Sequence, residues 1–147
     1  MLNILVINGP NINLLGLREP DIYGKGTYND LLKNIEKWSD DIGVRTKCVQ
    51  SNHEGDIVDF IQSAYGSFDG IVINPAAYTH TSVAILDALK AVSIPAVEVH
   101  ITDPETRESF RHISYAGMAC VKTVKGKGFL GYKEALEYLK QTLDANA

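Results

Sequence analysis

Residues 2–8, LNILVIN, form an almost wholly apolar run rich in β-branched side chains, and residues 70–74, GIVIN, repeat the pattern. Strands of a parallel sheet with helices on both faces have this composition, whereas half-exposed strands alternate apolar and polar residues. Each run ends in an asparagine, Asn8 in the first and Asn74 in the second. We therefore predict two buried parallel strands with polar carboxyl ends.

Three further runs have strand-like composition: Val44–Asn52, Ala96–Ile101 and Ala119–Val124. Between the five runs, apolar residues recur at the three- and four-residue spacings that are typical of helices. These helical patterns cover residues 31–38, 57–65, 83–89 and 136–143. Strands that alternate with helices indicate βαβ units. We predict one α/β domain over residues 1–147, a flavodoxin-like, doubly wound, five-stranded parallel sheet of order 2-1-3-4-5 with helices on both faces.

The composition is that of an ordinary globular protein. The chain of 147 residues is 45% hydrophobic and has a net charge of −4, which gives no reason to expect nucleic-acid binding. No apolar run approaches the roughly 20 residues that span a bilayer, and the first residues do not have the pattern of a signal peptide. Cys48 and Cys120 fall in predicted strands, so we expect buried free thiols and a cytoplasmic location.

Ligands of doubly wound sheets bind at the carboxyl ends of the strands. The first such end continues into a long loop, Asn8–Gly24, with the sequence NGPNINLLGLREPDIYG. Long ordered loops at strand ends commonly carry function. Arg18 and Tyr23 lie between Gly16 and Gly24, where glycine permits backbone movement. We predict a lid that brings a cation and a phenol over a substrate.

The fourth strand and its continuation supply further polar groups. Glu98 and His100 are two residues apart, so they face the same side of the sheet, either as a functional pair or as a structural one. Asp103-Pro104 is expected to begin a helix. Arg107 and Arg111, four apart on that helix, would share a face and could bind an anion, or could be a solvated pair.

The segment after the third strand offers an amide and an imidazole. Asn74 precedes small residues that let a ligand approach the backbone, and His80 lies just before the next helix, as a ligand-binding group or a capping one. With Glu98 and His100, His80 could form a two-histidine, one-carboxylate metal site. GxSxG and Walker A motifs are absent from the sequence, and the first loop, GPNIN, is not a GxGxxG motif.

Four stretches together resemble the type II 3-dehydroquinate dehydratases. They are NGPNINLLGLREPDIYG, QSNHEGDIVDFIQ, NPAAYTHTSVAILDAL and EVHITDPETRESFRHISY. The resemblance implies a flavodoxin-like fold and a cofactor-independent lyase of the shikimate pathway. Such an enzyme converts 3-dehydroquinate to 3-dehydroshikimate by trans-elimination through an enolate, and it is typically a dodecamer of four trimers.

The resemblance also assigns roles to residues of this sequence. Tyr23 would be the general base, His100 the general acid and Arg18 the lid cation that activates the tyrosine. The remaining assignments are Asn11 for the enolate, Glu98 to orient the acid or position water, Asn74, His80, Ile101, Thr102 and Arg111 to bind substrate, Asp87 to reach a neighbouring subunit's substrate, and Arg107 to stabilise the lid. The family uses neither a metal nor another cofactor.

The assigned chemistry is physically reasonable. A guanidinium about 4 Å from a phenolate contributes roughly 4 kcal/mol at an effective dielectric constant of about 20, enough to make a tyrosine a base near neutral pH. Thr102, Asp103 and Leu86 depart from the usual family residues, and Tyr28 is a second tyrosine near the lid. Three other functions stay open: a binding protein without catalysis, a metal-dependent hydro-lyase and a flavin or nucleotide carrier.

Overall fold

The computed structural model describes residues 1–17 and 19–147. The predicted lid cation, Arg18, lies outside the described residues. The strands are β1 (Asn3–Asn8), β2 (Arg45–Gln50), β3 (Gly70–Asn74), β4 (Ala96–His100) and β5 (Lys122–Lys125). They form one parallel sheet of order β2-β1-β3-β4-β5. The predicted strand order is therefore confirmed.

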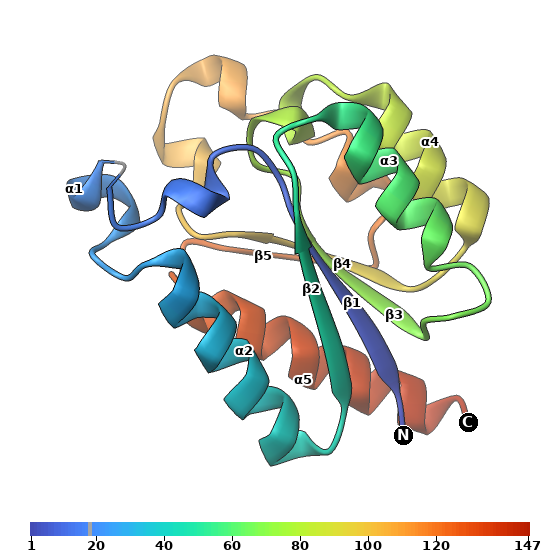
Figure 1. The fold of residues 1–147 in the computed structure, drawn as a ribbon. Helices are drawn as coiled ribbons and strands as arrows, with labels where there is room; N and C mark the ends of the chain where they lie inside the picture. Colours follow the sequence, from blue (N-terminus) through green and yellow to red (C-terminus); the bar gives the residue numbers. More distant parts are fainter. Residues whose placement is uncertain (18) are drawn as a thin grey trace.

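Four longer helices cover the two faces of the sheet. They are α2 (Tyr28–Ile42), α3 (Glu54–Ser63), α4 (Val83–Val92) and α5 (Leu130–Ala145). Helices α2 and α5 pack on one face, and α3 and α4 pack on the other (Figure 1). Side chains of β1 alternate between the two cores, with Ile4 and Val6 facing α2 and α5 and Leu5 and Ile7 facing α3 and α4. This two-sided burial explains why the strand sequence is apolar throughout.

Local sequence signals set the ends of the helices. Helix α2 begins with a capping box, in which the Thr27 hydroxyl accepts from the Asp30 amide at 3.1 Å and the Asp30 carboxylate accepts from the Thr27 amide at 3.0 Å. Ser82 is the N-cap residue of helix α4, and its hydroxyl oxygen accepts a hydrogen bond from the Ile85 backbone amide. The helical pattern continued to Tyr65, but α3 ends at Ser63 and Tyr65 is exposed.

Two segments differ from the sequence-based expectation. The region after β4 is not a single helix but two short 3-10 helices, η3 (Pro104–Thr106) and η4 (Ser109–Arg111). Asp103 does cap η3 through Glu105, but Arg107 is extended and interrupts the helix. Cys120 lies outside β5, because η5 (Ala116–Ala119) turns the chain there before the strand begins.

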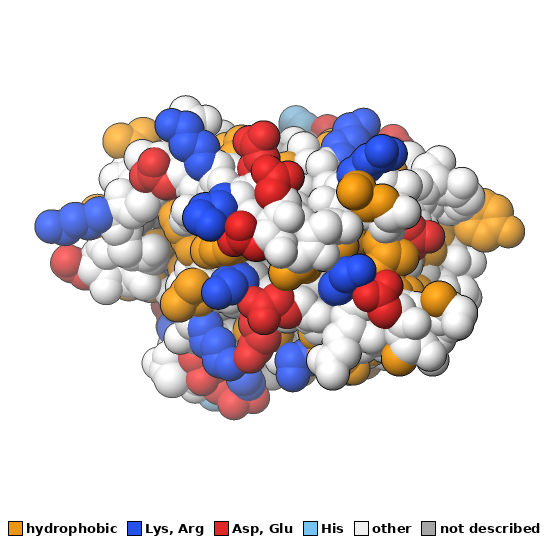
Figure 2. Space-filling model, turned by 90° about the horizontal axis from the view of Figure 1, so that it is seen from below, with side chains coloured by type: hydrophobic (Ala, Val, Ile, Leu, Met, Phe, Trp, Pro, Cys, Tyr) orange, Lys and Arg blue, Asp and Glu red, His pale blue; other side chains and the backbone are white. Residues whose placement is uncertain are grey.

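The first loop has its own short elements, η1 (Ile12–Leu14) and α1 (Pro20–Tyr23). It extends from the carboxyl end of β1 and lies at the same end of the sheet as η3 and η4 (Figure 1). The opposite end of the molecule has interspersed acidic and basic side chains, without a field of one sign (Figure 2). In the part of the chain that is described, no helix combines the length and the apolar composition needed to cross a bilayer.

Candidate active site

A pocket opens at the carboxyl ends of β1, β3 and β4, as the strand order predicts. The free space between its walls is about 500 Å³ when the open solvent at its mouth is included. The first loop, the segment after β3 and the segment after β4 all contribute to its wall. The residues that line it are Pro10, Asn11, Ile12, Tyr23, Asn74, Ala76, Ala77, His80, His100, Ile101, Thr102, Pro104, Arg107 and Arg111. Nine predicted site residues thus meet at one place.

Tyr23 and Arg107 face each other across this pocket. The Arg107 Nη1 donates to the Tyr23 hydroxyl oxygen at 2.8 Å, and the guanidinium carbon lies 5.4 Å from the centre of the Tyr23 ring. One guanidinium therefore binds both the oxygen and the ring of the phenol. The sequence assigned the phenol's activation to Arg18 and gave Arg107 a supporting role at the lid. In the structure, Arg107 contacts the phenol directly.

Glu98 and His100 form a buried pair at the end of β4. The His100 Nε2 and Glu98 Oε2 atoms are 2.7 Å apart, and the Glu98 side chain is fully buried. A carboxylate accepts, so Nε2 carries the shared proton and Nδ1 is the ring nitrogen left for the pocket. The predicted same-side arrangement is confirmed.

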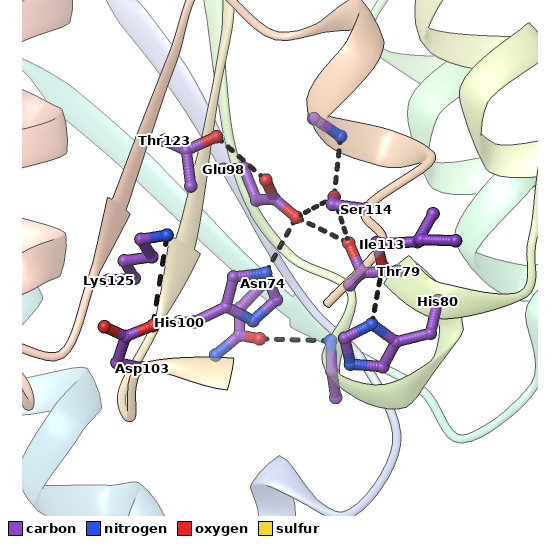
Figure 3. Close-up of polar contacts among 12 residues, drawn as sticks. Asn74, Thr79, His80, Glu98, His100, Asp103, Ile113, Ser114, Thr123 and Lys125 are labelled. Atoms are coloured by element: carbon purple, nitrogen blue, oxygen red, sulfur yellow. Dashed lines mark hydrogen bonds and ion pairs between the residues drawn. The ribbon is translucent and has the colours of Figure 1, made fainter. Parts of the chain in front are cut away.

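Three hydroxyl groups hold the Glu98 carboxylate in place (Figure 3). Thr79 and Ser114 donate to Oε2 at 2.5 Å each, and Thr123 donates to Oε1 at 2.9 Å. These donors come from η2 (Ala76–His80), from the segment after η4 and from β5. A Cβ atom at Gly117 would lie 2.7 Å from Oε1, so only glycine leaves room for this carboxylate.

These hydrogen bonds decide the ionisation of Glu98. Burial by itself raises the pKa of a carboxyl group, because a charge is poorly solvated in the interior. Hydrogen bonds from His100, Ser114 and Thr79, together with the imidazole's charge, outweigh burial and lower the pKa of Glu98 from 4.5 to about 2. Glu98 is therefore an anion at neutral pH, held against the His100 imidazole.

His80 is held by the backbone of another segment. Its Nδ1 lies 2.7 Å from the Ile113 carbonyl oxygen, which can only accept, so the proton is on Nδ1. Burial lowers the pKa of His80, with a partial offset from the Ile113 bond. The ring is neutral near pH 7, and its Nε2 is a hydrogen-bond acceptor for a ligand.

Asn11 and Asn74 approach the pocket from β1 and β3. Asn11 adopts a left-handed conformation with φ of 69°, which asparagine tolerates better than most residues, and its backbone amide donates to Asn52 Oδ1 at 3.0 Å. Asn74 is 2% exposed. Its side chain donates to Tyr132 and accepts from the Ala76 amide.

Arg111 completes the wall on the η4 side. Its Nε donates to Glu108 Oε2 at 2.6 Å, which holds the guanidinium in place. Ile101 and Thr102 follow β4 directly and line the same opening. Arg111 and Arg107 reach it together although they are not on one helix, because the extended backbone at Arg107 redirects the chain.

Two of the assigned residues do not line the pocket. Glu98 lies behind His100, where the hydroxyl groups enclose it, and Asp87 is exposed on α4. Tyr28, the alternative phenol, also does not line the pocket, and burial raises its pKa, with a partial offset from the nearby Asn8 amide. No three His, Cys, Asp or Glu side chains among the described residues are grouped so that they could hold a metal ion.

The sequence alone did not identify the hydroxyl groups around Glu98. Ser114 and Thr79 belong to quoted motifs, but neither had an assigned role, and Thr123 lies in an ordinary strand pattern. A buried carboxylate needs several hydrogen-bond donors. This requirement was the signal that serine or threonine side chains would surround Glu98. Which of them would reach Glu98 depends on tertiary packing.

Fold and pocket together define a flavodoxin-like α/β protein with a pocket of tyrosine, histidine and arginine side chains at the carboxyl edge of its sheet. The family model of dehydroquinase class II matches residues 2–140. The 3-dehydroquinate dehydratase of Clostridium acetobutylicum is 53% identical over 97% of this chain and 99% of its own length. That of Caldicellulosiruptor bescii is 51% identical over 98% of this chain and all of its own length.

A solved structure shows the same likeness. The type II dehydroquinase from Butyrivibrio crossotus has 50% sequence identity and a TM-score of 0.92, over 94% of this chain and 97% of that one. The chain belongs to the class II dehydroquinase family.

Proposed function

We propose that this protein removes water from 3-dehydroquinate to give 3-dehydroshikimate. The observation that carries the proposal is the placement of Tyr23 and the His100–Glu98 pair around one pocket, with the Arg107 guanidinium on the phenol. The relatives named 3-dehydroquinate dehydratase are about half identical to this chain over nearly its whole length, which supports the same substrate.

In the first step Tyr23, as the phenolate, takes the proton from the carbon next to the ketone. The electron pair of that carbon–hydrogen bond moves into the ketone and forms an enolate. A guanidinium that donates to the phenol oxygen stabilises the phenolate more than the neutral phenol. Arg107 occupies this position in the structure, and Arg18 stays the predicted second cation of the lid.

In the second step the enolate collapses and the carbon–oxygen bond to the leaving hydroxyl breaks. His100 donates its proton from Nδ1 to that hydroxyl, which departs as water. Glu98 supports the imidazolium form through Nε2 and makes the proton available where it is needed. Asn11 is the proposed donor to the enolate oxygen, by way of an ordered water.

The remaining pocket residues are the proposed substrate contacts. Arg111 supplies a held cation for the substrate carboxylate, together with backbone amides of Ile101 and Thr102. His80 accepts a hydrogen bond from a substrate hydroxyl at Nε2, and Asn74 offers its side-chain amide. Thr102 keeps the hydroxyl and the amide of the usual family serine, so this departure leaves the contact possible.

We also propose that the protein assembles as trimers within a dodecamer, as the resemblance implies. Four large apolar side chains between residues 110 and 121 are exposed in the single chain: Phe110, Ile113, Met118 and Val121. Such grouping is typical of a surface that contacts another protein. The exposed Asp87 would then reach the substrate of a neighbouring subunit.

A cytoplasmic location agrees with the two free thiols, Cys48 and Cys120.

The decisive experiment is an ultraviolet assay for the conjugated product, with purified protein, 3-dehydroquinate and a chelator. We expect turnover at the same rate with and without the chelator. Loss of activity with the chelator would indicate the metal-dependent hydro-lyase instead, and binding of substrate without any product would indicate a non-catalytic binding protein.

A further inference from the structure

Tyr132 is an unusual residue for its position. It lies in α5 and is fully buried between this helix and the sheet, among Val99, Ala135 and Leu136. A phenylalanine would fill the same space without a hydroxyl group that needs hydrogen-bond partners in the interior. The hydroxyl must therefore have a use at this place.

The Tyr132 hydroxyl joins the ends of two neighbouring strands. It donates to Asn8 Oδ1 at 2.7 Å and accepts from Asn74 Nδ2 at 2.9 Å. Burial raises the pKa of Tyr132, so the group stays protonated and can donate and accept at once. Asn8 and Asn74 are paired in register at the last position of β1 and β3, and both are almost completely buried.

These bonds fix the orientation of the Asn74 amide. Its Nδ2 donates to Tyr132, and its Oδ1 accepts from the Ala76 backbone amide at 3.1 Å. A flipped amide would place a donor against the Ala76 amide. The bond to Ala76 also holds a strained residue, because Ala76 has a φ of 53°. Asn74 and Ala76 both line the pocket, with His80 and His100 (Figure 3).

Asn8 shows that this arrangement is not simply the most stable one. Its Nδ2 is buried and makes no hydrogen bond to any described residue, which costs stability. An apolar pair at residues 8 and 132 would avoid this cost. What Asn8 does supply is an acceptor for the Tyr132 proton, so that the phenol oxygen faces Asn74 as an acceptor.

We infer that Tyr132 is a positioning residue for substrate binding, which acts from the core by fixing the Asn74 amide and, through it, the Ala76 turn. The inference rests on the proposed function, in which Asn74 contacts the substrate. Tyr132 itself does not line the pocket, so its effect must pass through Asn74.

A double-mutant cycle with Tyr132→Phe and Asn74→Ala tests this route. We expect Tyr132→Phe to raise KM for 3-dehydroquinate about tenfold, the value of one ordered hydrogen bond, and to leave kcat within about threefold. In the Asn74→Ala background the same change should alter KM less than about twofold, because the route is already broken.

Two control variants separate positioning from stability. Tyr138→Phe changes a tyrosine of the same helix whose ring packs over Lys122, and it should leave KM unchanged. Ile35→Val removes one methylene from the same core, so it should lower the melting temperature without a change in KM. Asn8→Ala keeps Tyr132 and removes its acceptor, so KM should rise by a smaller factor. This variant provides the test if Tyr132→Phe does not fold.

Three other outcomes are informative, and each would contradict a different claim. Equal effects of Tyr132→Phe in both backgrounds, or no effect on KM in the wild-type background, would refute the positioning role while the proposed activity stands. An unchanged KM in Asn74→Ala would remove Asn74 from the substrate contacts, and the inference with it. An inactive wild-type protein would instead refute the proposed function.

Discussion

At the scale of the residue, burial and hydrogen bonding have opposite effects on the pKa of Glu98. Glu98 is fully buried, and burial alone would favour its neutral form. The Ser114 and Thr79 hydroxyls and the His100 imidazole reverse that preference, so a carboxylate is kept beside His100. At Tyr23, the Arg107 guanidinium donates a hydrogen bond to the phenol oxygen.

The tyrosine base can be tested by removing one oxygen atom. Tyr23→Phe keeps the ring and its contact with Arg107, so the fold should persist. Loss of a general base typically lowers the rate by about 10² to 10⁴, and we expect a fall in kcat of about 10³. Tyr28→Phe is the matched control and should retain nearly full turnover. The opposite pattern would assign the base to Tyr28.

The ionised Glu98 predicts a pH dependence of stability. A pKa lowered from 4.5 to about 2 by folding contributes stability that is complete above the unfolded value and is lost as pH falls toward the folded one. Between about pH 6 and pH 3 this group should account for a loss of about 2 kcal/mol.

Denaturant unfolding of wild type and Glu98→Gln across that range measures the effect. Because glutamine does not titrate, the stability advantage of the wild type over the variant should shrink as the pH falls. A constant difference would mean that Glu98 is not held as an anion in the folded protein.

At the scale of the element, the η3–η4 segment places its two arginines in a way that a continuous helix would not. Its two short turns with an extended Arg107 between them direct Arg107 toward Tyr23 of α1 and Arg111 to the wall of the same pocket. On a continuous helix the two guanidinium groups would share one face. The break thus lets Arg107 contact Tyr23 while Arg111 contacts Glu108.

Arginine-to-lysine variants show which cation activates the phenol. An ammonium lacks the planar, bidentate geometry of a guanidinium, so Arg107→Lys should lower kcat about tenfold or more. Arg18→Lys should do so as well if Arg18 is the predicted lid cation. Arg45→Lys, on the exposed β2 surface, is the control. Full activity of Arg107→Lys with an inactive Arg18→Lys would leave Arg18 as the activating cation.

At the scale of the whole molecule, the single chain presents a nearly complete pocket beside a surface with exposed apolar side chains. Asp87 lies outside that pocket, so the proposed role of Asp87 needs a neighbouring subunit. Assembly and substrate binding are therefore linked in this proposal.

A charge introduced at the apolar surface tests that link. Met118→Glu should reduce the assembly to smaller species in light scattering, because a buried unpaired carboxylate disfavours the interface. Asp87→Ala should keep the assembly and raise KM. An unchanged KM for Asp87→Ala in the intact assembly would argue against a site shared between subunits.

The sequence by itself determined the five strands, the four longer helices, the strand order and the family. These follow from local information, namely the apolar runs, the helical spacing, the capping residues and motifs that are contiguous in the chain. The same motifs placed nine assigned residues at one pocket, because parallel strands bring their carboxyl ends to one edge of the sheet.

Only the tertiary structure decided which side chains touch. Arg107 meets Tyr23 across 84 positions of sequence and Tyr132 meets Asn8 across 124, and no periodicity encodes such pairs. The break between η3 and η4 and the hydroxyls around Glu98 likewise depend on how the elements pack. A hydrogen bond depends on a few tenths of an ångström and on direction, whereas a sequence pattern specifies only which face of an element is buried.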